Sequence, residues 1–143
     1  MTEPIRFFND DIKYELRNKA AVRQWINKAI KKEGFVLRNL HYIYCSDKCL
    51  NQINRHYLRH NTLTDIITFD LSLSKKEIEA EIYVSIERVR ENATTYHVTF
   101  RNELLRVMIH GVLHLCGYKD KAPADIKRMR KREDYYLSLR SFL

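Results

Sequence analysis

The sequence predicts an α+β fold, a single domain over residues 1–143 in which helices pack on a small mixed β-sheet. Three observations indicate this class. In some segments apolar residues have the spacing of a helix face, and in others apolar and polar residues alternate as in a strand. Only 3 Gly and 2 Pro occur, and 45% of the residues are hydrophobic, as expected for regular elements around a core. The length suits one domain.

The first predicted elements are a helix and a strand. Five apolar residues have the spacing of one helix face: Val22, Trp25, Ile26, Ala29 and Ile30. Gly34 is placed to end this helix. The segment 35–45 is rich in aromatic and β-branched residues and alternates around Leu40, Tyr42 and Tyr44, which predicts a strand.

A capped helix and two further strands are predicted next. Ser46 can cap a helix that carries Leu50, Ile53 and Tyr57. The segments 65–71 and 81–86 have strand-like composition. Because their connection is short, we expect them to pair antiparallel.

Three helices complete the prediction. One begins near Glu87, and one runs from about Phe100 to Cys116 with an apolar side. Pro123 is placed to open the last helix, since a first turn needs no N–H from it. That helix carries the basic run KRMRKR.

The charge is strongly positive and unevenly distributed. The formal net charge is +8, and residues 119–143 contribute half of it. Such a field attracts polymers that carry phosphate, although a generally basic surface is the alternative. Three cysteines, an odd number, and no apolar leader favour a reducing compartment, so we expect a cytoplasmic protein. No run of residues is long and apolar enough to predict a membrane span, and the oligomeric state is not predicted.

The segment HGVLHLCGYKD, residues 110–120, predicts a metal site at the end of the long helix. His110 and His114 are four residues apart and share a helix face, so both rings can reach an ion roughly 2.0–2.1 Å away. Gly117 can end the helix and let Asp120 return as a third ligand. Two imidazoles suit Zn2+, and three protein ligands leave one position open, as in catalytic zinc sites. A chance HxxxH with hydrogen-bonded core histidines is the alternative.

Two neighbouring residues refine this interpretation. HxxxH is most familiar within HExxH of metallopeptidases, where the glutamate is the general base. Here that position is Gly111, which disfavours peptide hydrolysis. Glu103 lies two turns before His110 and could contact an imidazole or be a solvated charge. No residue stands out as a general base.

HGVLHLCGYKD resembles the HGxLHLxGYDH motif of the YbeY family, bacterial endoribonucleases also called ribosomal RNA maturation factors, at nine of eleven positions. LNQINRHYLRHNTLTDIITF and AEIYVSI resemble two further segments of that family, LN…YR…PTDVLSF and GDIxIS. Glu103 also matches a family glutamate. The resemblance spans roughly residues 49–120.

The resemblance implies an α+β fold and one zinc ion bound by His110, His114 and Asp120. It also implies cleavage of single-stranded RNA, maturation of the 3′ end of the small-subunit ribosomal RNA, and ribosome quality control. Two departures stand out in the motif. Asp120 replaces the third histidine of the family, which a carboxylate oxygen can do, and Lys119 replaces the preceding aspartate.

A third departure concerns a phosphate-binding arginine. In the family's YR the arginine follows the tyrosine directly, whereas Arg59 comes one place later than that. A planar guanidinium suits phosphate oxygens, so Arg59 is the candidate catalytic residue that clamps phosphate.

The basic last helix is the expected RNA-binding surface. Five of its side chains are candidates for phosphate contacts: Lys127, Arg128, Arg130, Lys131 and Arg132. The expected partners are ribosomal RNA and the small ribosomal subunit. Two other functions are kept as alternatives, a non-catalytic ribosome-associated factor with a structural metal and, less favoured, a metallopeptidase.

Overall fold

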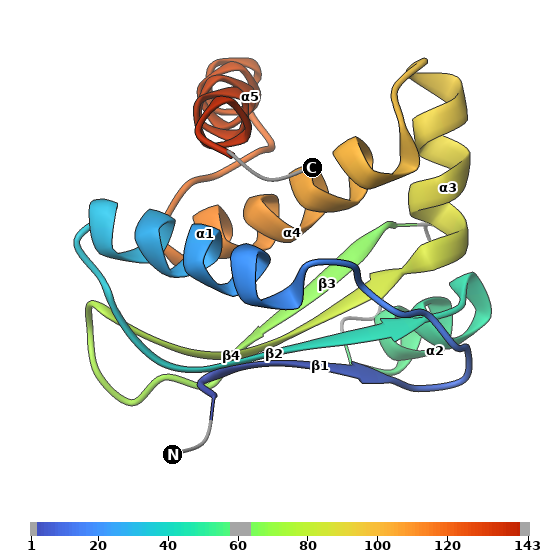
Figure 1. Ribbon diagram of the computed structural model, residues 1–143, viewed down its shortest axis with the longest axis horizontal. Coiled ribbons are helices and arrows are strands. Elements are labelled where there is room, and N and C mark those ends of the chain that lie inside the picture. The colour runs from blue at the N-terminus through green and yellow to red at the C-terminus, as the bar shows by residue number, and fades with distance from the viewer. Residues whose placement is uncertain (1–2, 58–63, 141–143) are drawn as a thin grey trace.

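The computed structural model describes residues 3–57 and 64–140, and its four strands form one sheet in the order β1-β2-β4-β3 (Figure 1). The strands are β1 (Ile5–Asn9), β2 (Val36–Cys45), β3 (Ile66–Asp70) and β4 (Glu77–Ser85). β1 and β4 each pair parallel with β2, and β3 pairs antiparallel with β4. The sheet is therefore mixed, and the predicted antiparallel pair is confirmed.

The described part of the chain also contains five helices: α1 (Lys19–Lys32), α2 (Asp47–Tyr57), α3 (Ile86–Thr95), α4 (Phe100–Leu115) and α5 (Pro123–Ser138). α1 and α4 lie on one face of the sheet, with α5 outside them, and α3 stands beside the start of α4 (Figure 1). α2 covers part of the other face, where Leu50 packs with Cys45 and Ile67.

Local sequence explains where these elements begin and end. Ser46, Ser85 and Thr99 each accept a hydrogen bond from the backbone N–H three residues later, at 3.1, 3.1 and 3.0 Å, so each caps a helix. Gly34 has a φ of 86° just after α1, as expected for a helix end. Pro123 is the first residue of α5, as predicted.

Strand β4 shows why one face of the sheet is apolar. Ile78, Ala80, Ile82 and Val84 alternate with more exposed residues and are buried in the main core, under α1 and α4. The prediction for this strand was wrong at its ends. β4 begins at Glu77 rather than residue 81, and Ile86 belongs to α3 because Ser85 caps that helix.

Helix α4 lies very close to the sheet at one glycine. A Cβ atom on Gly111 would be 2.8 Å from Ile66 Cδ1 and 2.9 Å from Ile82 Cδ1. Side chains of β3 and β4 therefore fill the space that a larger residue at this position would need. Position 111 therefore faces Ile66 and Ile82 of the sheet.

No helix within residues 3–57 and 64–140 has the length and apolar character that crossing a bilayer requires.

Candidate metal centre

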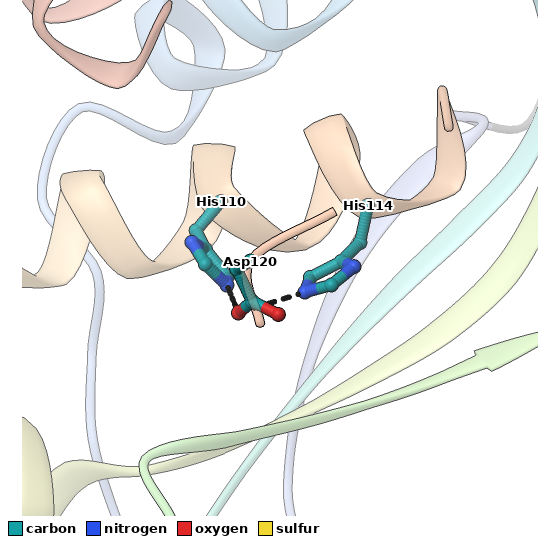
Figure 2. A group of neighbouring side chains, drawn as sticks. All are labelled: His110, His114 and Asp120. Carbon is teal, nitrogen blue, oxygen red and sulfur yellow. Dashed lines mark ion pairs between the residues drawn. The ribbon is translucent and has the colours of Figure 1, made fainter. Parts of the chain in front are cut away.

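The three predicted ligands converge at the end of α4 and the loop after it (Figure 2). His110 and His114 project from the same side of α4, with ring centroids 4.8 Å apart. Past Leu115 the chain turns at Gly117, whose φ of 101° is the left-handed conformation that glycine adopts readily. The turn brings Asp120 back beneath both rings.

The distances suit a tetrahedral metal ion. The Nε2 atoms of His110 and His114 lie 3.2 and 3.1 Å from the same oxygen, Oδ2 of Asp120. Ligands about 2.0–2.1 Å from a tetrahedral ion are about 3.3 Å from one another. All three ligand atoms lie within 4.8 Å of one another. Two imidazole nitrogens and a carboxylate oxygen also form a donor set that zinc accepts, so these residues could hold a metal ion.

His110 is oriented by a carboxylate that the sequence did not indicate. Its Nδ1 lies 2.6 Å from Oε2 of Glu133, which comes from α5 and is 4% exposed. Oε1 of Glu133 accepts a hydrogen bond of 2.9 Å from Arg106. A carboxylate that holds Nδ1–H leaves Nε2 free to bind a metal. The carboxylate in contact with the ring is therefore Glu133 and not Glu103.

The surrounding charges favour the protonated ring of His110. Burial alone would lower its pKa. The hydrogen bond to Glu133 and the negative charges of Glu133, Asp65 and Asp120 outweigh burial and raise the pKa of His110 above its ordinary value. The same negative charges would stabilise a divalent cation in this place.

The loop that carries Asp120 is fixed by Glu33 at the end of α1. Glu33 accepts a 2.9 Å hydrogen bond from the Tyr118 hydroxyl and a 2.8 Å hydrogen bond from Nε of Arg132, and it also accepts one from the Tyr136 hydroxyl. Burial opposes ionisation of Glu33, but these three donors lower its pKa below the ordinary value. One carboxylate thus joins α1, the Asp120 loop and α5.

Two hollows meet at the candidate metal ligands. One, of about 500 Å3, is lined by all three ligands together with β3 and Asn54 of α2. The other, of about 290 Å3, lies between α3, α4 and α5 and shares His110, Asp120 and Asp65 with the first. The side chains of His110 and His114 are 21% and 36% exposed, so the centre is open to a substrate from outside.

Two acidic residues near the centre differ from simple surface charges. Glu103 is 5% exposed, and burial raises its pKa above the ordinary value, so neither sequence-based interpretation of this residue was right. Burial likewise raises the pKa of Asp65, which lines both hollows. The sequence placed Asp65 only at the start of a strand.

The five predicted RNA-binding residues lie on α5 and are not among the three candidate ligands. Arg59 is outside the described residues. On α5, Lys127, Arg128, Arg130 and Lys131 are exposed, and only Arg130 lines the smaller hollow. Arg132 forms an ion pair with Glu33 and stacks on Tyr135 and Tyr136.

Fold and cluster together define a class, a small α+β domain with a mixed sheet and a candidate His₂Asp metal centre at the end of a long helix. A family model described as "Endoribonuclease YbeY" matches residues 5–140. The chain belongs to the endoribonuclease YbeY family, which supports an endoribonuclease role and therefore an RNA substrate.

Individual relatives agree with this assignment. The curated endoribonuclease YbeY of Cytophaga hutchinsonii is 50% identical over 140 residues, 98% of each chain. That of Flavobacterium psychrophilum is 51% identical over 132 residues, covering 92% of this chain and 94% of the relative. The solution structure of TM1509 from Thermotoga maritima is similar, with a TM-score of 0.63 and 29% identity, over 94% of this chain and 87% of that one.

Proposed function

We propose that this protein is a zinc-dependent endoribonuclease specific for single-stranded RNA, acting in the cytoplasm on the 3′ end of the small-subunit ribosomal RNA and in ribosome quality control. The observation that carries the proposal is the convergence of His110, His114 and Asp120 beside an open hollow. Membership of an endoribonuclease family supports RNA as the substrate.

The residues of the centre have distinct tasks in this proposal. A zinc ion held by the three ligands would act as a Lewis acid toward a phosphodiester oxygen. Glu133 keeps Nε2 of His110 directed at the ion through the hydrogen bond to Nδ1. Asp120 supplies the anionic ligand, and Glu33 fixes its loop through Tyr118. The larger hollow, which β3 lines, adjoins the centre, so an extended RNA strand can approach it there.

Arginine and lysine side chains would hold the RNA. Arg59 keeps its sequence-based role as the residue that clamps the phosphate. The exposed cations of α5, namely Lys127, Arg128, Arg130 and Lys131, would contact phosphates on either side of the centre. We leave Arg132 out of this set because its guanidinium is bound to Glu33. Either water or the RNA's own 2′-hydroxyl can be the nucleophile, and the chemistry of the product termini distinguishes the two routes.

A non-catalytic factor with a structural metal is the second candidate, since a His₂Asp cluster can also stabilise a helix end. A peptidase is disfavoured because Gly111 stands where the metallopeptidase motif has its catalytic glutamate, and any side chain there would have to displace the ends of Ile66 and Ile82.

The test compares three proteins on a single-stranded ribosomal RNA fragment: wild type, His114→Ala and His41→Ala. His41 is a matched control, because Tyr42 beside it faces α4 and His41 therefore points to the other face of the sheet. We expect wild type and His41→Ala to cut the RNA and a chelator to stop cleavage by both. The cleavage rate of His114→Ala should be at least about a hundredfold lower than that of wild type. RNA cleavage that is unaffected by the chelator and by His114→Ala would refute the proposal of a metal-dependent nuclease.

Metal analysis of the freshly purified protein tests the identity of the ion separately. We expect about one zinc per chain in wild type and in His41→Ala, and less in His114→Ala. Another divalent ion at the same stoichiometry would correct the metal but keep the mechanism.

A further inference from the structure

The smaller hollow beside the metal centre has the composition of a recognition pocket. It is lined by residues of α3, α4 and α5 and has a volume of about 290 Å3. Glu103 and Val107 of α4 form one wall, Asn92 and Tyr96 come from the end of α3, and Ile126 comes from α5. His110 and Asp120 also line it, so it adjoins the metal ligands.

Glu103 is the unusual group in this hollow. The residue is 5% exposed, and within residues 3–57 and 64–140 its carboxyl group takes part in no hydrogen bond or ion pair. Burial raises the pKa of its carboxyl group. The oxygens of Glu103 are not among the fully buried side-chain atoms that lack a partner in residues 3–57 and 64–140, and Glu103 lines the hollow, so its carboxyl group is accessible from it. A ligand in the hollow can therefore donate hydrogen bonds to this carboxyl group.

The position of Glu103 on α4 excludes direct contact with the ion. Glu103 is seven residues before His110, which corresponds to two turns on the same face and about 10 Å along the helix axis. That separation is too long for a metal ligand or for a base that acts at the ion. It suits contact with the nucleotide next to the one whose phosphodiester is cut.

The rim of the hollow offers surfaces for a flat ring. Tyr96 and Ile126 are large side chains that are 56% and 50% exposed, although both border the hollow. An exposed aromatic ring is a common platform on which unpaired bases stack. Arg130, also exposed on the rim, can balance the charge of a nearby phosphate.

We propose that this hollow is a nucleobase pocket, which receives the base of the nucleotide beside the cleaved bond and favours guanine through Glu103. The proposal rests on the proposed function. Two adjacent N–H groups on the Watson–Crick edge of guanine match the two oxygens of one carboxylate. No other RNA base presents two adjacent N–H donor groups. Tyr96 stacks on the ring, and Asn92, whose side-chain amide donates to Asp65 at 3.5 Å, also lines the hollow.

Binding of mononucleotides tests the pocket without any cleavage. Metal-free wild type is titrated with 5′-GMP, 5′-AMP, 5′-CMP and 5′-UMP by calorimetry or NMR. We expect GMP to bind most tightly, and Glu103→Gln to weaken GMP binding by about tenfold or more, since one acceptor becomes a donor. Glu79→Gln, on the opposite face of the sheet, should bind GMP as wild type does.

Tyr96→Ala provides a second variant at an exposed position, where folding is not at risk. It should weaken all four mononucleotides by about tenfold, as the loss of one stacking platform does. Equal affinity of wild type for the four mononucleotides, or unchanged GMP binding in Glu103→Gln, would overturn the proposal.

Product sequencing separates this proposal from the nuclease itself. We expect wild type to leave guanine at one fixed position beside the cut, and Glu103→Gln to lose that preference. RNA cleavage with no base preference would refute the proposed guanine pocket but leave the proposed nuclease function intact. If GMP binding depends on Glu103 but the protein does not cleave RNA, the proposed pocket is retained and the proposed nuclease function is refuted.

Discussion

Glu133→Gln is expected to weaken zinc binding by about 10–100-fold, which corresponds to about 1.4–2.7 kcal/mol. The carboxylate accepts from Nδ1 of His110 at 2.6 Å and from Arg106 at 2.9 Å in a place that is 4% exposed. Glutamine keeps the size of the side chain but not its charge. Its amide N–H₂ can also turn toward Nδ1 and favour the tautomer whose Nε2 carries the proton.

The assay is a zinc titration against a competing chromogenic chelator at neutral pH, because affinity is read without any turnover. Asp134→Asn is the matched control. Asp134 also binds Arg106, at 2.6 Å, but is 58% exposed and does not touch His110. We expect the zinc affinity of the control to lie within about twofold of wild type, because Asp134 does not contact the ligands and distant substitutions act nearly independently.

Two results would refute the reasoning. Zinc affinity of Glu133→Gln equal to that of wild type would mean that the contact to Nδ1 does not orient the ring. Equal losses in Glu133→Gln and Asp134→Asn would mean that Arg106, or net charge, accounts for the effect. Urea unfolding of both variants verifies that a weaker affinity does not reflect an unfolded protein.

Three further predictions concern stability and RNA binding. The pKa of Glu33 is lowered in the folded state, so its contribution to stability is present above the unfolded pKa and is lost as pH falls through the folded value. Glu33→Gln should therefore lower the free energy of unfolding by about 2 kcal/mol at neutral pH and by progressively less in acid. Urea unfolding at a series of pH values measures this, and a loss that does not depend on pH would contradict the prediction. The double variant Lys127→Ala/Lys131→Ala should reduce the slope of log affinity for single-stranded RNA against log salt concentration by about 1.4. Fluorescence anisotropy measures the affinity, and an unchanged slope would mean that RNA does not contact these two lysines. The buried Tyr42 hydroxyl donates to the Met108 carbonyl at 2.9 Å, so Tyr42→Phe should lower the free energy of unfolding by about 1 kcal/mol, and a neutral result would show that this bond adds nothing.

The sequence predicted the parts of the fold that depend on local patterns. Helices α1 and α4 follow from apolar spacing, α5 from Pro123, and β3 and β4 from composition. The three ligands were predicted for the same reason, since two lie one turn apart and Gly117 directs the third back to them. Each of these signals lies within about a dozen residues.

The parts that were not predicted depend on contacts between distant segments. Strand β1 has no strong signal of its own and is defined by parallel pairing with β2, as in the pair Ile5 and Leu40. Glu133 lies in a basic run and resembles a solvated charge until α5 packs beside α4. Glu103 sits two turns from His110, but nothing local shows that α3 and α5 bury it.

The carboxylate that orients His110 belongs to α5, the last of the described elements to leave the ribosome during synthesis. The chain is made from its N-terminus, so the segment with the three ligands emerges while Glu133 is still missing. A nascent chain would then offer the two imidazoles with neither ring fixed, and selection among competing cations would be poor. In the proposed zinc enzyme, productive loading of the centre would therefore follow translation of α5.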